Sequence, residues 1–231
     1  MKPINILRLI AAFLCLSPVL TSAAETIDEI VVTADFRERA AADLPASVTV
    51  LDREEIEQRS VQHFEELVNA VPNLSWSGDG HRARYFQMRG VGELEQYQGA
   101  PNPSVGFLID DIDFSGIGTV ATLFDMQQIE VLRGPQGTRY GANALAGLIY
   151  MRSAEPTPDF NARVEVQAGD DGMLAGGFAV GGGLTADDSV MGRLSVHHHE
   201  SNGFRENTYL NRDDTNGRNE TTLRGRLKWS G

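Results

Sequence analysis

The sequence predicts an α+β domain that is followed by the first antiparallel strands of an incomplete transmembrane β-barrel. Two observations support this fold class. Residues 47–155 combine two helical patterns with short apolar runs, which is typical of a compact α+β unit. Residues 156–231 instead contain segments of about ten residues in which apolar and polar side chains alternate, as in membrane-spanning strands.

The first 24 residues have the pattern of a secretory signal peptide. A basic start with Lys2 and Arg8 precedes an apolar stretch over residues 9–20, and small residues precede Glu25. This stretch is too short for a transmembrane helix, which needs about 20 apolar residues. We therefore expect residues 1–24 to be removed and the mature chain to begin near Glu25.

Cysteine content and charge exclude some classes of protein. Cys15, the single cysteine, lies within the signal peptide, so the mature chain would have no disulfide and is not a disulfide scaffold. The chain has 20 basic and 32 acidic residues, and loss of residues 1–24 would change its formal net charge from −12 to −14. With no Lys/Arg run, this acidity argues against binding to nucleic acid.

Residues 25–46 are polar and alanine-rich around one apolar island, Ile30-Val31-Val32. The β-branched residues of the island favour an extended chain, and an extended peptide can add as a strand to the edge of a partner's sheet. The same pattern fits a short first strand of the folded domain. We expect an extended tail that carries one segment suited to strand addition.

Local patterns predict each element of the α+β domain in order. Residues 48–51 form a strand, and Asp52 with Glu55 forms a capping box that starts a helix. Ser60 is the expected N-cap of a second helix, which Pro72 ends. Its apolar face consists of residues at helical spacing: Val61, Phe64, Leu67, Val68 and Val71. Further strands are predicted from short apolar runs at 85–88, 105–109, 129–132 and 148–151.

The segment VLRGPQGTRYG, residues 131–141, is a strand that runs into a series of turn signals. Gly134 and Pro135 end the strand, while Gly137 and Gly141 allow backbone angles that a side chain would forbid. A phosphate-binding loop is the alternative, but the glycines lack the following Lys-Ser or Lys-Thr and the G-x-G-x-x-G order. A structural turn is therefore predicted.

Four segments with alternating polarity follow the domain, at residues 162–168, 174–184, 190–199 and 221–229. They predict strands with polar side chains facing inward and apolar side chains facing outward. A soluble β-meander packed on the domain is the alternative. Four strands cannot close a barrel, and an open edge would leave backbone groups unpaired in hydrocarbon.

Four motifs in this order resemble the N-terminal part of TonB-dependent outer-membrane receptors: IDEIVVTA (27–34), FQMRGVG (86–92), PSVGFLIDD (103–111) and VLRGPQGTRYG (131–141). The resemblance implies a plug domain at residues 47–155 and the first strands of a barrel of about 22 strands at residues 156–231. We therefore expect the sequence to be a fragment or a truncated gene product.

The resemblance also implies functional residues. The segment that is similar to the TonB box contains Asp28, Glu29, Ile30, Val31, Val32, Thr33 and Ala34. The plug motif contains Glu130, Arg133, Gly134, Pro135, Gly137, Tyr140 and Gly141. Plug loops that face outward would touch the ligand, which nominates Arg89, Val91, Phe114, Ser115 and Phe124.

The partners implied by the resemblance are TonB, with its ExbB/ExbD complex, and a scarce ligand at the cell surface. A ferric siderophore is the ligand expected first, and cobalamin, haem, other metal chelates and oligosaccharides are the alternatives. The expected location is the bacterial outer membrane, with no cofactor and no enzymatic activity. The rival hypothesis is a soluble periplasmic plug that binds TonB or ligand without transport.

Other polar clusters give no catalytic or metal-binding pattern. Asp110, Asp111 and Asp113 lack the glycine and distal Glu of a calcium loop and are expected to cap a turn. In residues 197–199, three histidines on one strand cannot converge on one ion, because the middle side chain points away. Glu130, Arg133 and Arg89 are expected to face charges of the barrel wall; ordinary surface charges are the alternative.

Overall fold

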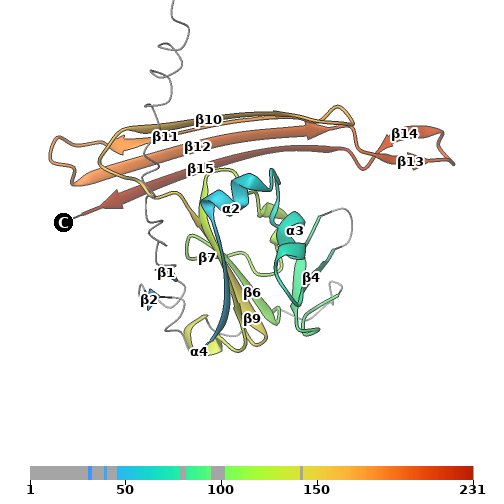
Figure 1. The fold of residues 1–231 in the computed structure, drawn as a ribbon, viewed down its shortest axis with the longest axis horizontal. Coiled ribbons are helices and arrows are strands. Elements are labelled where there is room, and N and C mark those ends of the chain that lie inside the picture. The colour runs from blue at the N-terminus through green and yellow to red at the C-terminus, as the bar shows by residue number, and fades with distance from the viewer. Residues whose placement is uncertain are drawn as a thin grey trace, which may run out of the picture.

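The computed structural model describes residues 31–32, 39–40, 46–78, 82–94, 102–140 and 143–230 (Figure 1). The predicted signal peptide lies outside the described residues. Six predicted site residues also lie outside them: Asp28, Glu29, Ile30, Thr33, Ala34 and Gly141. Among the helices that are described, none has the length and apolar character needed to cross a membrane.

A five-stranded sheet with the order β3-β8-β9-β6-β7 forms the centre of the α+β domain. Only β6 and β9 are parallel, and the other neighbouring pairs are antiparallel. The strands are β3 (Ser47–Asp52), β6 (Val105–Ile109), β7 (Ile112–Asp113), β8 (Met126–Arg133) and β9 (Gly147–Ser153). The four strands predicted for this sheet are therefore confirmed, each with at most a few residues added.

Two short helices pack beside the sheet. The first, α2 (Arg53–Gln58), begins as predicted, because Asp52 Oδ1 accepts a hydrogen bond of 2.8 Å from the Glu55 amide. The second, α3 (Phe64–Leu67), continues into the 3₁₀ turn η2 (Val68–Ala70). The predicted N-cap Ser60 is wrong: Ser60 adopts a left-handed turn with φ of 50°, and the extended His63 caps α3 instead.

The remaining elements of the domain are a hairpin and two short turns of helix. They are β4 (Leu74–Ser77), β5 (Tyr85–Met88), η3 (Gly118–Val120) and α4 (Gly137–Tyr140). The core between helices and sheet contains Phe64, Phe86 and Phe107, whose ring centroids lie 5.3–6.3 Å apart. This aromatic cluster fixes α3 and β5 against the central sheet.

A second sheet of four antiparallel strands has the order β10-β11-β12-β15. Its strands are β10 (Asn161–Ala168), β11 (Leu174–Gly183), β12 (Val190–Ser201) and β15 (Arg218–Trp229). The hairpin of β13 (Arg205–Asn207) and β14 (Arg212–Thr215) extends the connection between β12 and β15 beyond one end of the sheet (Figure 1). We call this second sheet the strand sheet.

The α+β domain lies against one face of the strand sheet, and the strands of the two sheets run crosswise (Figure 1). The opposite face is apolar and open: Val164, Val166, Leu223 and Leu227 are 70–78% exposed. The alternate residues of the strands point inward, toward the domain; on β12 they include Arg193, His197 and His199, which are buried. The predicted polar-inward, apolar-outward alternation is confirmed.

Candidate functional site

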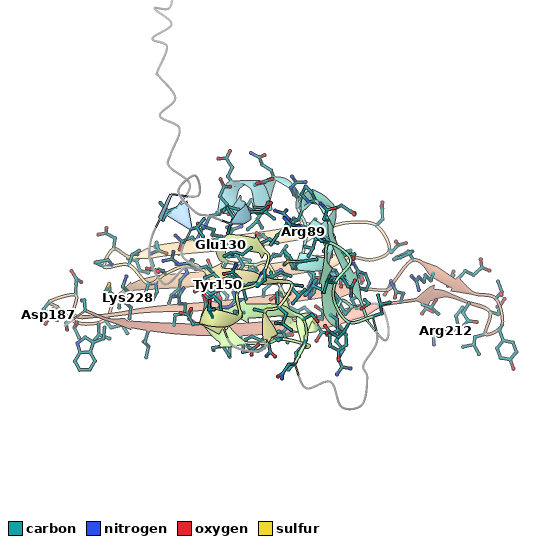
Figure 2. All side chains as sticks on the ribbon, turned by 90° about the horizontal axis from the view of Figure 1, so that it is seen from below. Arg89, Glu130, Tyr150, Asp187, Arg212 and Lys228 are labelled. Carbon is teal, nitrogen blue, oxygen red and sulfur yellow. The ribbon has the colours of Figure 1, made fainter. Side chains whose placement is uncertain are left out.

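Charged side chains join the inner face of the strand sheet to the α+β domain. Figure 2, which views the domain against the strand sheet from below, shows Lys228 and Asp187 toward one end of that sheet and Arg212 at the other. Three groups of polar contacts cross this boundary. We call the boundary the docking interface and describe its groups along β12 and β15.

The first group surrounds Arg82, which lies three residues before the start of β5. Its guanidinium contacts the domain residue Glu65 at 2.9 Å and donates a 2.7 Å hydrogen bond from Nε to Glu220 of β15. A third bond of 2.7 Å runs to Gln62, and Arg218 of β15 adds a contact of 3.2 Å to Glu65. The side chains of Arg82 and Glu65 are only 9% and 4% exposed, so these charges depend on one another rather than on water.

His63 lies beneath this group and is fully buried. Its Nδ1 accepts a hydrogen bond from the Glu65 amide and its Nε2 donates to the Thr119 carbonyl. Burial, reinforced by the charge of Arg82, lowers the pKa of His63 to about 4. The imidazole is therefore neutral at physiological pH, and the assigned hydrogen bonds are those of one neutral tautomer.

The second group centres on Asp125, at the turn before β8. Arg193 of β12 binds both of its carboxylate oxygens, at 2.7 Å from Nε and 2.5 Å from Nη2, and both side chains are nearly inaccessible to solvent. The adjacent Phe124 ring stacks on His197 with centroids 5.1 Å apart. Arg224 of β15 donates to the Phe124 carbonyl at 3.0 Å. This group combines a bidentate ion pair with the aromatic contact of the docking interface.

The third group joins the end of β9 to β15. Arg226 donates to the Ser153 carbonyl at 2.7 Å and lies 3.4 Å from the carboxylate of Asp110. Lys228 contacts Glu155 at 3.1 Å, and Arg152 contacts the same carboxylate. Hydrogen bonds from Arg152 and Lys228 outweigh burial and lower the pKa of Glu155 to about 2.

These contacts can hold a domain in place but contain no catalytic arrangement. Removing one partner of a buried ion pair costs about 3–5 kcal/mol, because a charge is left unpaired away from water. Separating both partners into water costs less, because each ion then regains the hydration that it lost on burial. The docking interface therefore resists the loss of single contacts and tolerates a hydrated, separated state.

The two described residues of the predicted TonB box form the strand β1 (Val31–Val32), which pairs with β2 (Arg39–Ala40). Val32 is fully buried in a small apolar cluster with Leu132 and Leu148. The Val31 carbonyl accepts a 2.7 Å hydrogen bond from Gln128 of β8. Its role in binding TonB stays a prediction, and in this arrangement strand addition requires that Val32 leave the domain.

The five predicted ligand residues lie in three separate places. Arg89 and Val91 follow β5 at one of its ends, and Val91 is 52% exposed. Phe114 packs on the core, and the Ser115 hydroxyl accepts a hydrogen bond from the Phe107 amide; both lie near the other end of β5. Phe124 is buried in the docking interface. The structure does not bring the five residues together, and their contact with ligand stays a prediction.

Glu130 and Arg133 of the plug motif form hydrogen bonds within the α+β domain. Glu130 is fully buried and accepts a hydrogen bond from Gln128. Arg133 donates to the Pro72 carbonyl and to the hydroxyls of Ser47 and Thr49. We expected contacts with the barrel wall, but among the described residues these partners of Arg133 belong to the domain itself. Burial, reinforced by the charge of Arg89, lowers the pKa of Arg133.

The turn residues of the motif give one correction. Gly134 follows the last residue of β8, as predicted, and its φ of +112° favours glycine, a need that was predicted for Gly137 and Gly141 instead. Gly137 has no such angle, because it begins α4, where helical backbone angles suit any residue. The exposed Pro135 precedes this helix, and Tyr140, partly buried, packs on the cluster that contains Val32.

The polar clusters without a predicted function bind within the domain or face the interior. Asp110 accepts hydrogen bonds from Ser153, and Asp113 caps the turn at the Ser115 amide. His197 and His199 face the domain while His198 faces outward, as the strand geometry predicts. Within the described part of the chain, no three acidic, histidine or cysteine side chains are arranged to hold a metal ion.

Sequence reasoning missed the residues that make the docking interface. Arg193, Glu220 and Arg226 carry the inward polar positions of the predicted strands, so the alternation could have nominated them as wall residues. No comparable pattern marks Arg82 or Asp125, because their partners lie 138 and 68 positions away in the sequence.

The fold and the docking interface together define a class of protein: a folded domain held by ion pairs against the polar face of a membrane-type strand sheet. Residues 40–148 match the protein family described as TonB-dependent Receptor Plug Domain. The vitamin B12 transporter BtuB of Vibrio vulnificus is 24% identical over 213 residues, which cover 88% of this chain and 33% of the transporter. The pesticin receptor of Yersinia pestis is 31% identical over 129 residues, which cover 55% of this chain and 19% of the receptor.

Solved structures give the same assignment. The ferric yersiniabactin uptake receptor FyuA from Yersinia pestis superposes with a TM-score of 0.69 at 26% identity, over 82% of this chain and 29% of the receptor. The ferripyoverdine receptor of the outer membrane of Pseudomonas aeruginosa, at 20% identity and a TM-score of 0.70 over 87% of this chain and 25% of that chain, has the same fold. Residues 40–148 belong to the family of TonB-dependent receptor plug domains, and the relatives that match the chain are receptors and transporters of this class, which supports the predicted location in the outer membrane. It spans a third or less of the length of these relatives.

Proposed function

We propose that this chain is the N-terminal part of a receptor that imports a scarce ligand across the outer membrane with energy supplied by TonB. The observation that carries the proposal is the docking interface, where a plug domain is held against the inner face of membrane-type strands by buried ion pairs. An importer needs a plug that blocks its lumen at rest and that can be displaced without being destroyed. This cycle is possible with ion pairs, because the charged groups on both surfaces are hydrated once the surfaces separate.

TonB is the proposed source of displacement, and residues 28–34 are its proposed binding segment. Val31 and Val32 form a two-residue strand that pairs with β2 outside the central sheet, and an extended segment of this kind can add to the edge of a partner's sheet. TonB would act with its ExbB/ExbD complex. The force would enter the domain at β8, because the Gln128 side chain connects Val31 to that strand.

A ferric siderophore is the proposed ligand. The Yersinia pestis receptor of ferric yersiniabactin, at 26% identity, and the ferripyoverdine receptor both bind iron chelates, which supports this class. The relatives also include transporters of vitamin B12, so cobalamin is the alternative ligand. The apolar outer face of the strand sheet argues against the rival function of a soluble periplasmic plug, because large apolar patches are rarely left in water.

The substitution Val31→Pro tests the proposal in cells that carry the complete receptor. Proline removes a backbone donor that strand addition would use, so energised uptake of radiolabelled iron chelate should fall to the level of a strain without TonB. Binding of the same chelate to cells without a proton gradient should be unchanged. Val31→Ala, which keeps the amide, is the matched control, and uptake that survives in Val31→Pro would exclude the segment as the TonB-binding site.

A further inference from the structure

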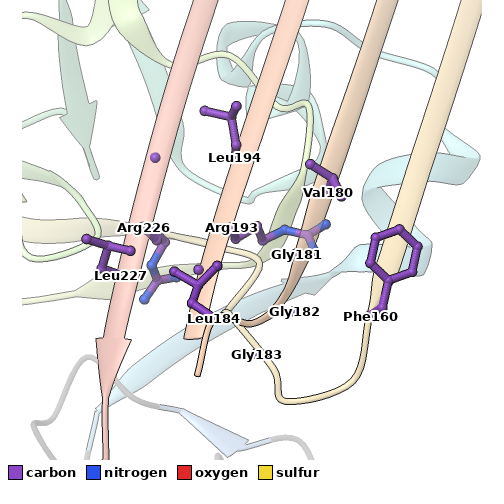
Figure 3. Close-up of a pocket in the computed structure, with 12 residues that line it drawn as sticks. Phe160, Val180, Gly181, Gly182, Gly183, Leu184, Arg193, Leu194, Arg226 and Leu227 are labelled. Atoms are coloured by element: carbon purple, nitrogen blue, oxygen red, sulfur yellow. The ribbon is translucent and has the colours of Figure 1, made fainter. Parts of the chain in front are cut away.

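The outward face of the strand sheet contains a groove of about 640 Å³ between rows of apolar side chains (Figure 3). We call it the outer groove. Its floor is formed where Gly182 and Gly192, paired across β11 and β12, and Gly225 of β15 have no side chain. Its rim consists of Phe160, Val180, Leu184, Leu194 and Leu227.

The outer groove is apolar because the charged side chains of the strands that form it point toward the opposite face of the sheet. Arg193 and Arg226 also line it, but their guanidinium groups point to the opposite face, where they bind Asp125 and Ser153 of the plug. The rim is open to the surroundings: Phe160 and Leu227 are each 78% exposed. A Cβ built on Gly225 would meet no atom within 4 Å, so the part of the groove above β15 is free space.

The position of the groove along the strands points to a lipid. Trp229, 81% exposed, lies two residues beyond Leu227 on the same face of β15, at the end of the strand. Exposed tryptophans at strand ends mark the boundary between membrane and water. The outer groove therefore lies just inside that boundary, at the depth where acyl chains begin.

The turn at the same end of the sheet determines which headgroup fits. Asp187 and Asp188 lie in the connection between β11 and β12, and Asp188 reaches over Gly183 at the edge of the groove. Hydrogen bonds from Thr185 and Ser189 hold the Asp187 carboxyl in its charged form, with a pKa of about 2. Two carboxylates at this place attract an ammonium group and repel an anionic headgroup.

We propose that the outer groove binds one acyl chain of a zwitterionic phospholipid whose headgroup carries a primary ammonium, such as phosphatidylethanolamine. The acyl chain would lie over the glycines, between the leucine side chains, and the acidic turn would select the headgroup. The site is separate from the docking interface, on the opposite face of the sheet, and does not depend on the identity of the imported ligand.

Quenching of Trp229 fluorescence by phospholipids with brominated acyl chains tests the proposal. The receptor, purified from the outer membrane, is placed in bilayers of brominated phosphatidylethanolamine or phosphatidylglycerol mixed with unlabelled lipid. The signal of Trp229 is the difference between proteins with and without Trp229→Phe. We expect Trp229 to report a higher association constant for phosphatidylethanolamine than for phosphatidylglycerol.

Filling the groove should weaken this binding. Gly225→Leu places a side chain in the free space and should lower the association constant about fourfold for each methylene of lipid that it displaces. Gly176→Leu is the matched control: it lies on the same outward face away from the groove, and its Cβ would meet only the Glu165 carbonyl at 3.8 Å. Equal association constants in Gly225→Leu and Gly176→Leu would overturn the acyl-chain site.

The acidic turn has its own variant. The double variant Asp187→Asn with Asp188→Asn keeps the size of the side chains and should make the association constants of the two lipids equal. A preference for phosphatidylethanolamine that persists in this double variant would overturn the proposed selection of the headgroup.

Discussion

Asp125→Asn isolates the contribution of the ion pair between Asp125 and Arg193 to plug docking. Asn keeps the shape of the side chain and tolerates the left-handed backbone of this position, whose φ is 60°. It removes the charge that faces Arg193 while both side chains stay buried. Breaking a buried pair on one side costs about 3–5 kcal/mol. With a urea dependence of about 2 kcal/mol per molar for a domain of this size, the midpoint of plug unfolding should fall by about 2 M.

A single introduced cysteine provides the assay. Residues 25–231 contain no cysteine, so Ala121→Cys, at a fully buried position, gives a thiol within this part of the chain that reacts only when the plug opens. The midpoint is read from thiol labelling of the membrane-embedded receptor over a urea series. Asp187→Asn, which removes the same charge from an exposed turn, is the control and should not shift the midpoint.

The double variant Asp125→Asn with Arg193→Met decides between a lost ion pair and a general loss of packing. Methionine removes the unpaired guanidinium charge, so most of the lost stability should return. A midpoint for Asp125→Asn equal to that of Asp187→Asn would refute the reasoning, because the pair would then contribute nothing to docking. A double variant no more stable than Asp125→Asn would attribute the loss to packing instead.

Two further predictions use the same labelling assay. The pKa of His63 is about 4 in the folded plug and 6.5 in its ordinary state, so the unfolded plug binds a proton first as the pH falls. The free energy of unfolding therefore has its full value above pH 6.5 and decreases by about 3 kcal/mol as the pH drops to 4. His63→Gln should remove this decrease, and a wild-type plug whose stability does not change between pH 7 and 4 would contradict the buried neutral imidazole. Gly177→Ala should destabilise docking by about 1–3 kcal/mol, because its Cβ would lie 2.9 Å from the rings of Phe124 and His197. Gly176→Ala is its control, and equal midpoints for the two alanine variants would exclude close packing of Phe124 against the wall.

The sequence predicted those features that depend on near neighbours in the chain. The capping contact between Asp52 and Glu55 spans three residues, and the alternation of β10 or β15 has a period of two, so both are visible in any short window. Ser60 was assigned wrongly because its left-handed turn is selected by the packing of α3 on the core, which local pattern does not contain. Gly137 was misread for a similar reason, since a glycine after a turn can equally begin a helix.

The docking interface could not be predicted in the same way, since its contacts join residues far apart in sequence. Alternation indicates that Arg193 faces inward but not that Asp125 receives it. Phe124 illustrates the difficulty: an aromatic residue after a loop fits an exposed ligand contact, and only the position of His197 across the interface explains its burial. A resemblance between motifs names the elements, whereas the pairing of side chains across the two sheets required the structure.

The distribution of apolar contacts explains how a plug can be both fixed and removable. The aromatic core formed by Phe64, Phe86 and Phe107 lies within the α+β domain, whereas the docking interface is formed mainly by charged groups, with Phe124 as its aromatic contact. An interface sealed by apolar surface would be penalised by about 25 cal/mol for each Å² exposed on separation. Charged groups, by contrast, recover hydration as they part, so the separated state is less costly than the loss of any single partner. Force applied at β1 would therefore part the two sheets at the docking interface before it opened the core of the plug.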